Sequence, residues 1–230
     1  MTYGFKCIDE TPAFLVVAKD AGVPFHTRGE ESGLCRLVHE QLEIPIYPVH
    51  RLDEVTSGLI LLAKTREAAR DLAGLFRQRT ITKHYIALSD QIPLKKQGLI
   101  QGDMVRTRRG CWKLTRSMDN PARTRFISCS ILPGMRLFLL KPLTGRTHQI
   151  RVALKSIGAP ILGDRRYHHA VTPWPDRTYL HAYGLHFYLY DKEFSYSCIP
   201  QSGEYFRSPE VLQQIERLGD PNSFQWPGKH

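Results

Sequence analysis

The stretch 50–64 constrains the fold most strongly, because it joins a polar loop directly to a short apolar run. The loop contains Arg51 and Asp53 and ends in a turn signal at 56–58, and residues 59–63 are all apolar. An apolar run of this length predicts a buried strand. The carboxylate of Asp53 is therefore expected on a loop that enters a core strand, where functional residues are often held. From the pattern alone, a surface loop with an ordinary Arg51–Asp53 charge pair is the favoured interpretation, because surface ion pairs are common.

The charge balance narrows the choice of partners. The chain of 230 residues has 32 Lys and Arg against 22 Asp and Glu, a net charge of +10. Such an excess favours a polyanion, with nucleic acid first and an anionic membrane second. The sequence contains no run of 18 apolar residues, so a transmembrane helix is not expected. Residues 1–6 also lack the apolar segment of a signal peptide. We therefore expect a cytoplasmic protein with no membrane partner.

Cysteine and histidine usage argues against a disulfide framework and a metal site. The cysteines are scattered, odd in number and without a C-x-x-C pair, which is typical of reduced thiols (Cys7, Cys35, Cys111, Cys129, Cys198). His148, His181 and His186 could be considered as metal ligands, but they form neither H-x-x-x-H nor H-E-x-x-H. Buried, hydrogen-bonded histidines are the favoured interpretation, and neither a metal nor a cofactor is expected.

Apolar runs and turn signals predict strands, and capping residues predict helices. Strands are expected at 14–19, 59–63, 83–88, 124–132, 135–140 and 179–190. Helices are expected after the N-caps Ser32, Thr65, Thr147 and Ser208. Many strands with few helices indicate an α+β fold with a mixed, mostly antiparallel sheet flanked by helices. No linker divides the chain, so residues 1–219 are predicted to form one domain and 220–230 a C-terminal tail.

The segment 95–125 is the most basic part of the chain, and Trp112 lies inside it (Lys95, Lys96, Arg106, Arg108, Arg109, Lys113, Arg116, Arg123, Arg125). Basic side chains interleaved with an aromatic ring suit a phosphate backbone and a stacked base. A solvated hairpin whose charges protect a sheet edge would have the same composition. The residues alone leave both interpretations open.

Three ordered motifs, read together, resemble the RluA-type family of pseudouridine synthases. The first is His-Arg-Leu-Asp at 50–53 followed by Thr-Ser-Gly, and the second is Lys-His-Tyr-Ile-Ala-Leu at 83–88. The third is Gly-Arg-Thr-His-Gln-Ile-Arg at 145–151, followed by Gly-Asp at 163–164. The resemblance covers nearly the whole chain, from about residue 5 to residue 206, with Leu-His-Ala at 180–182 fitting a late strand motif. It implies the pseudouridine synthase catalytic fold.

The resemblance also implies roles for individual residues. Asp53 is similar to the family's catalytic aspartate, and Arg151 to its ion-pair partner. Tyr85 is similar to the ring that stacks on the target uracil and assists a late proton transfer; without the resemblance it would be read as a packed aromatic residue with a hydrogen-bonded hydroxyl.

Further positions of the same motifs are expected to bind substrate. Arg51 resembles the side chain that fills the space left by a flipped nucleotide, and Ile150 an apolar contact to the base. His50 and Leu52 flank Arg51, and they too are expected to bind substrate. Elsewhere the chain departs from the family, with Asp20 where a proline is usual after Lys19 and Ala153 where a histidine is usual. None of these departures removes a proposed catalytic residue.

Elementary chemistry supports the implied activity, in which a uridine is isomerised to pseudouridine in ribosomal or transfer RNA. A nearby arginine keeps an aspartate ionised even when it is desolvated. One carboxylate suffices because no water must be activated, unlike glycoside hydrolysis. A base within folded RNA must be extruded first, and a planar arginine can occupy the gap. The resemblance, and not the sequence itself, implies that the chain acts as a monomer.

Two other functions remain open at this stage. The first is a non-catalytic RNA-binding protein on the same fold, although such a module would have no reason to keep Asp53, Tyr85 and Arg151 together. The second is a hydrolase of a nucleoside bond, which the absence of a second carboxylate in the motifs disfavours.

Overall fold

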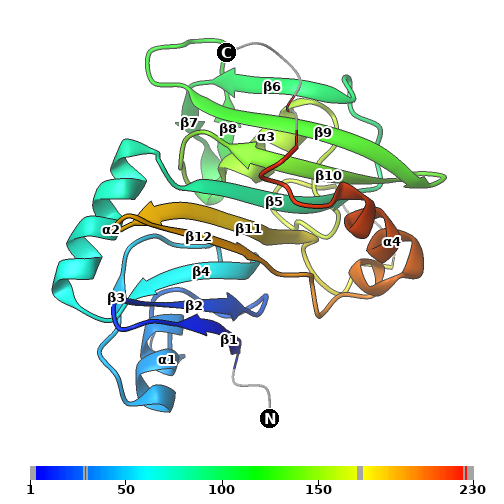
Figure 1. Ribbon diagram of the computed structural model, residues 1–230. Helices are drawn as coiled ribbons and strands as arrows, with labels where there is room; N and C mark the ends of the chain where they lie inside the picture. Colours follow the sequence, from blue (N-terminus) through cyan, green and yellow to red (C-terminus); the bar gives the residue numbers. More distant parts are fainter. Residues whose placement is uncertain (1–3, 28, 30, 170–172, 225, 227–230) are drawn as a thin grey trace. The chain divides into compact units, whose positions relative to one another are not determined.

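The computed structural model describes residues 4–27, 29, 31–169, 173–224 and 226 (Figure 1). The helices are α1 (Leu34–Leu42), α2 (Arg66–Gln78), α3 (Gln149–Ser156) and α4 (Pro209–Leu218), with short 3₁₀ turns η1 (Arg108–Gly110) and η2 (Tyr205–Arg207). The strands are β1 (Phe5–Glu10), β2 (Phe14–Lys19), β3 (Tyr47–Pro48), β4 (Ser57–Ala63), β5 (Thr82–Ser89), β6 (Gln97–Gly102), β7 (Met104–Arg106), β8 (Trp112–Leu114), β9 (Ala122–Leu132), β10 (Met135–Pro142), β11 (Leu180–Leu189) and β12 (Lys192–Ser197). The predicted α+β class with mostly antiparallel pairing is confirmed.

The chain divides into two compact units. Unit 1 comprises residues 1–82 and 182–200, and unit 2 comprises residues 83–181 and 201–230. The strand β11 begins in unit 2 and continues in unit 1. Among the described residues, no helix is long and apolar enough to cross a membrane. All five cysteines are free thiols, as their scattered positions predicted.

In unit 1 the strand order is β1-β2-β4-β11, with β3 added to β4 and β12 to β11 (Figure 1). The strands β2 and β4 pair antiparallel with Val16 opposite Leu61. All seven residues of β4 are buried, so both of its faces are covered. This explains the continuous apolar run in the sequence, since a strand exposed on one face would alternate polar and apolar residues.

The helix α2 covers one face of this sheet. Its residues Ala68 and Leu72 pack in one cluster with Leu59 and Leu61 of β4. The helix begins where Thr65 caps it, because the Thr65 hydroxyl accepts the N–H of Ala68 at 3.1 Å. The predicted cap is confirmed. The strand β4 and the loop before it therefore rest on a packed core.

In unit 2 the strand order is β5-β10-β9-β6, while β7 and β8 form a separate hairpin. The strands β9 and β10, predicted at 124–132 and 135–140, form a hairpin with Met135 opposite Leu132 across the turn. Gly134 in that turn has a φ of +77°, a conformation that favours glycine. The final helix α4 also begins as predicted, with Ser208 as its N-cap and Pro209 in its first turn.

Three local predictions are wrong by one or two residues. The first helix is capped by Gly33, not Ser32; a Cβ at Gly33 would lie 2.5 Å from the backbone of Thr27, so only glycine fits. The helix α3 is capped by His148 in the left-handed region, not by Thr147. The turn before β4 lies at 54–55, because β4 already begins at Ser57. Of the predicted tail 220–230, residues 225 and 227–230 lie outside the described part of the chain.

Candidate active site

The loop of Asp53 in unit 1 is held by hydrogen bonds to its main chain. The N–H of Thr56 donates to the carbonyl of Asp53 at 3.0 Å, which closes a tight turn. The next carbonyl, of Glu54, accepts the N–H of Gly22 at 2.8 Å and the Nζ of Lys19 at 3.0 Å. Asp53 itself is half-buried. The backbone that carries the predicted catalytic carboxylate is thus fixed from the segment after β2.

Lys19, the last residue of β2, holds this loop, and sequence reasoning did not predict that role. Its side chain is 1% exposed, and its ammonium also donates to the carbonyls of Asp20 and Val23, each at 2.8 Å. An ammonium has three N–H donors, so these three carbonyls match its capacity. In the sequence, Lys19 is a lysine that follows an apolar run and precedes Gly22. This pattern predicts only the end of a strand, not a buried ammonium that holds a loop.

The neighbours of Asp53 differ in exposure. His50 accepts the N–H of Leu61 through Nε2 at 2.9 Å, and its ring stacks on Phe76 at 4.3 Å. Leu52 is buried at 4% exposure, whereas Arg51 is exposed. The contacts of His50 tie the loop to β4 and α2. Substrate contacts by His50, Leu52 and Arg51 stay predictions.

In unit 2, Tyr85 lies on β5 opposite Leu140 of β10 and is 9% exposed. Lys83 is two residues earlier on the same strand, so both side chains point to one face of the sheet. Burial lowers the pKa of the Lys83 ammonium. Lys83 was not a predicted site residue, although the sequence places it two positions before the motif tyrosine.

The start of α3 is fixed by the buried amide of Gln149. Its Oε1 accepts the hydroxyl of Thr144 at 2.7 Å and the N–H of Arg146 at 3.0 Å. Its Nε2 donates to the carbonyl of Arg123 at 3.0 Å. The following residues, Ile150 and Arg151, are 7% and 3% exposed. The first turn of α3 therefore presents both predicted site residues from a rigid position.

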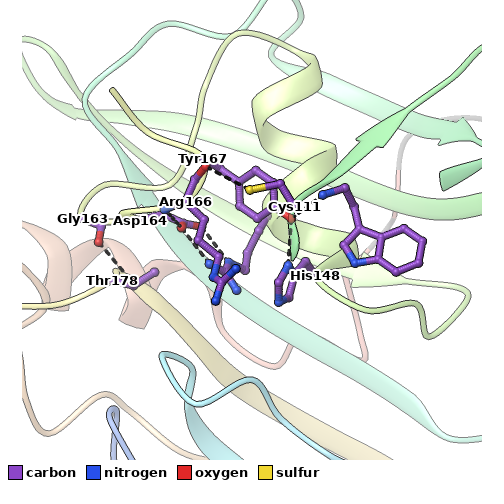
Figure 2. A network of polar contacts seen from close by, with 9 residues as sticks. Cys111, His148, Gly163, Asp164, Arg166, Tyr167 and Thr178 are labelled. Carbon is purple, nitrogen blue, oxygen red and sulfur yellow. Dashed lines mark hydrogen bonds and ion pairs between the residues drawn. The ribbon is translucent and has the colours of Figure 1, made fainter. Parts of the chain in front are cut away.

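Arg151 forms a buried ion pair with Asp164. Its Nε donates to Oδ2 at 2.7 Å and its Nη2 to Oδ1 at 2.8 Å, and the Arg151 Cζ lies 5.0 Å from the ring centre of Tyr167. Figure 2 shows Asp164, Tyr167 and His148 in this network of unit 2. The sequence motif contained Asp164 but did not reveal its partner. Asp53 belongs to unit 1, so its predicted pairing with Arg151 stays a prediction.

Unit 1 carries a carboxylate on a fixed loop, and unit 2 carries a guanidinium held by Asp164, an aromatic ring and basic side chains. Such groups can stabilise and transfer charge at a sugar and a base. Among the described residues, no group of three or more His, Cys, Asp or Glu is arranged to hold a metal ion.

Comparisons with known proteins agree with this chemistry. A family model described as RNA pseudouridylate synthase matches residues 13–156, which include Asp53, Tyr85 and Arg151. An uncharacterized RNA pseudouridine synthase from Haemophilus influenzae is 50% identical over 204 residues, which are 88% of this chain and 91% of that protein.

More distant relatives differ in the RNA that their names give. Ribosomal large subunit pseudouridine synthase C from Rickettsia bellii is 34% identical over 58% of this chain and 46% of its own length. The mitochondrial tRNA pseudouridine(32) synthase of Saccharomyces cerevisiae is 31% identical over 70% of this chain and 37% of its own length. The alignments therefore span less than half of either relative.

A solved structure, Human RNA Pseudouridylate Synthase Domain Containing 1, superposes on this chain with a TM-score of 0.75 and covers 99% of both chains. At 23% identity this similarity establishes the shared fold. Together, the family match and the relative at 50% identity establish that the chain belongs to the RluA-type RNA pseudouridine synthases, a family of isomerases.

Proposed function

We propose that this protein isomerises a specific uridine of ribosomal or transfer RNA to pseudouridine, with Asp53 as the catalytic aspartate. One observation carries the proposal: the aspartate of the family motif stands on a loop whose main chain is fixed by Lys19, Gly22 and Thr56. A reacting group gains from such fixed geometry, because small displacements of a catalytic group are costly.

The reaction breaks the C1′–N1 bond of uridine and forms a C1′–C5 bond; the hydrogen on C5 leaves as a proton, and N1 takes up a proton. Asp53 serves either as a nucleophile at C1′ or as a base toward the sugar, and both roles need its ionised form. Arg151 is proposed to stabilise that carboxylate, and Tyr85 to stack on the uracil and assist the loss of the C5 proton.

Arg51 is proposed to enter the space that the extruded nucleotide leaves. Its exposure suits this role, because a side chain that must reach into RNA cannot be buried in the core. Ile150 supplies an apolar contact to the base. His50 and Leu52 are proposed to support the substrate contacts of Arg51 from the same loop.

The hairpin β7–β8 is proposed to contribute to RNA affinity. Arg106, Arg108, Arg109 and Lys113 on this hairpin are exposed, and Trp112 is half-buried beside them. Exposed cations supply the sequence-independent part of affinity, which weakens as salt is raised. The relatives named for ribosomal and transfer RNA support both pools as substrate sources. We expect the protein to act in the cytoplasm as a monomer.

The test is tritium release from RNA labelled at uridine C5. Ribosomal and transfer RNA transcripts would be incubated with wild type, Asp53→Asn and Asp71→Asn. The last variant is a matched control, because it makes the same change on α2 of the same unit, in a surface ion pair with Arg70. We expect release by wild type and Asp71→Asn, and none by Asp53→Asn.

The outcomes separate the proposals. Release from one RNA pool identifies the substrate class. Release by Asp53→Asn at the wild-type rate would exclude the assigned catalytic role. The wild type could bind RNA yet release no tritium from either pool or from labelled total RNA of cells lacking the protein. That result would favour the non-catalytic RNA-binding alternative.

A further inference from the structure

The ion pair of Arg151 and Asp164 is almost completely buried. The two side chains are 4% and 0% exposed. Desolvating two charges is expensive, and a well-packed apolar pair is often as stable. A buried pair of this kind is therefore better explained by the need to hold one of its members in a set orientation.

The carboxylate of Asp164 is itself held on a rigid turn. The N–H of Asp164 donates to the carbonyl of Ile161 at 3.1 Å, and its own carbonyl accepts the N–H of His168 at 2.8 Å. Its Oδ1 also accepts the N–H of Arg166 at 3.0 Å. Gly163, just before it, has a φ of +74°, and a Cβ there would lie 1.9 Å from the carbonyl oxygen of Arg177. The acceptor for Arg151 thus has little freedom to move.

The ring of Tyr167 restrains the guanidinium from a second direction. Tyr167 is 2% exposed, and its hydroxyl bonds His148 Nδ1 at 2.8 Å and accepts the N–H of Trp112 at 3.0 Å. Figure 2 shows His148 and Tyr167 pointing toward one another. His148 caps α3 and Trp112 begins β8, so one hydroxyl joins the helix of Arg151 to the basic hairpin.

We propose that Asp164 is a positioning residue for the reaction, which orients the Arg151 guanidinium with the help of the Tyr167 ring. Asp164 accepts from both Nε and Nη2 of Arg151, and this bidentate geometry fixes the plane of the guanidinium. This inference rests on the proposed function, in which Arg151 serves the isomerisation.

The test is single-turnover tritium release with enzyme in excess over the RNA that wild type modifies. For Asp164→Asn we expect the rate constant to fall about 100-fold, as a displaced catalytic group would cause. The dissociation constant for RNA and the final amplitude of release should stay unchanged. Asp90→Asn is the matched control, because it makes the same change in another charged pair of unit 2, the partly exposed pair with His168 at 2.7 Å, and should keep the wild-type rate constant.

A merely structural role gives a different result, since partial loss of folded protein lowers the concentration of active enzyme found by titration with RNA but leaves the single-turnover rate constant of the remaining enzyme unchanged. That result would overturn the proposal. If circular dichroism shows Asp164→Asn to be unfolded, Asp164→Glu keeps the charge and shifts the guanidinium by one methylene. We expect it to fold and to react about 10-fold more slowly, because geometry controls the rate; the wild-type rate would overturn the proposal.

Failure of the proposed function is visible in the same experiment. If wild type releases no tritium from any RNA, both proposals fall. If wild type reacts and Asp164→Asn reacts equally fast with the same amplitude, the proposed function stands and only the role of Asp164 is excluded.

Discussion

Two buried cations, one in each unit, are held in different ways. Lys19 in unit 1 is 1% exposed, and its ammonium donates hydrogen bonds to the carbonyls of Asp20, Val23 and Glu54. Arg151 in unit 2 is 3% exposed and meets the carboxylate of Asp164 with two parallel hydrogen bonds. The difference follows from their shapes, because an ammonium has three rotatable donors, whereas a guanidinium is a planar fork that matches a carboxylate.

The comparison teaches what each cation controls. Because Lys19 binds main-chain oxygens, it sets the path of the loop that carries Asp53. Because Arg151 binds a side chain, it is itself the group whose orientation is set. Substitutions at these two positions should therefore differ in their effects on stability and on reaction rate.

The largest effect is expected for Arg151→Met. This change leaves the Asp164 carboxylate buried without the charge that compensates it, which costs about 4 kcal/mol of unfolding free energy. Urea denaturation measures the loss. Arg151→Lys, which keeps the charge but not the fork, should lose less. Equal losses for the two variants would show that the fork geometry is unimportant.

A smaller loss is expected for Lys19→Met. Removing the ammonium leaves buried carbonyls without their hydrogen bonds, which should lower the unfolding free energy by about 2–3 kcal/mol. Tritium release should also slow, because the loop of Asp53 becomes less rigid. Lys64→Met is the matched control, because Lys64 makes a partly exposed ion pair with Glu10, worth about 0–1 kcal/mol. If Lys19→Met reacted at the wild-type rate, the link between Lys19 and the loop would be disproved.

His50→Phe tests the other attachment of the loop. Phenylalanine can keep the stacking on Phe76 but cannot accept the N–H of Leu61, which costs about 1–2 kcal/mol. Denaturant titration should detect the change, and RNA affinity measured by filter binding should separate this structural role from a substrate contact. A loss of affinity without a loss of stability would reverse the assignment.

The smallest effect is a pH dependence in unit 2. Burial disfavours protonated His168, but its hydrogen bonds to Asp90 and to the carbonyl of His169, together with the negative charges of Asp90 and Asp164, outweigh this and raise its pKa above the usual 6.5. Protonated His168 therefore stabilises the fold below about pH 6.5, and this contribution is lost as the pH rises through the folded pKa. The stability difference between wild type and Asp90→Asn should be larger at about pH 5.5 than at about pH 8.5. A difference independent of pH would rule out the His168–Asp90 linkage.

Short-range signals determined much of the fold. The run 14–19 formed β2 with the predicted bounds, and Pro133–Gly134 turned β9 into β10. Thr65 and Ser208 capped their helices. In each case the residues that decide the structure are neighbours in the chain, so their spacing is sufficient evidence. The motif positions of Asp53, Tyr85 and Arg151 were likewise readable from the sequence, although their joint action stays a proposal.

Tertiary structure decided the rest. The edge strands β1 and β12 were not predicted, because their mixed polar and apolar residues become strands only beside β2 and β11. The role of Lys19 depends on carbonyls as far along the chain as Glu54. Asp164 reaches Arg151 only because the turn that begins at Gly163 brings it back to α3. A sequence pattern records the type and spacing of residues, whereas a buried charge finds its partner only when distant segments fold together.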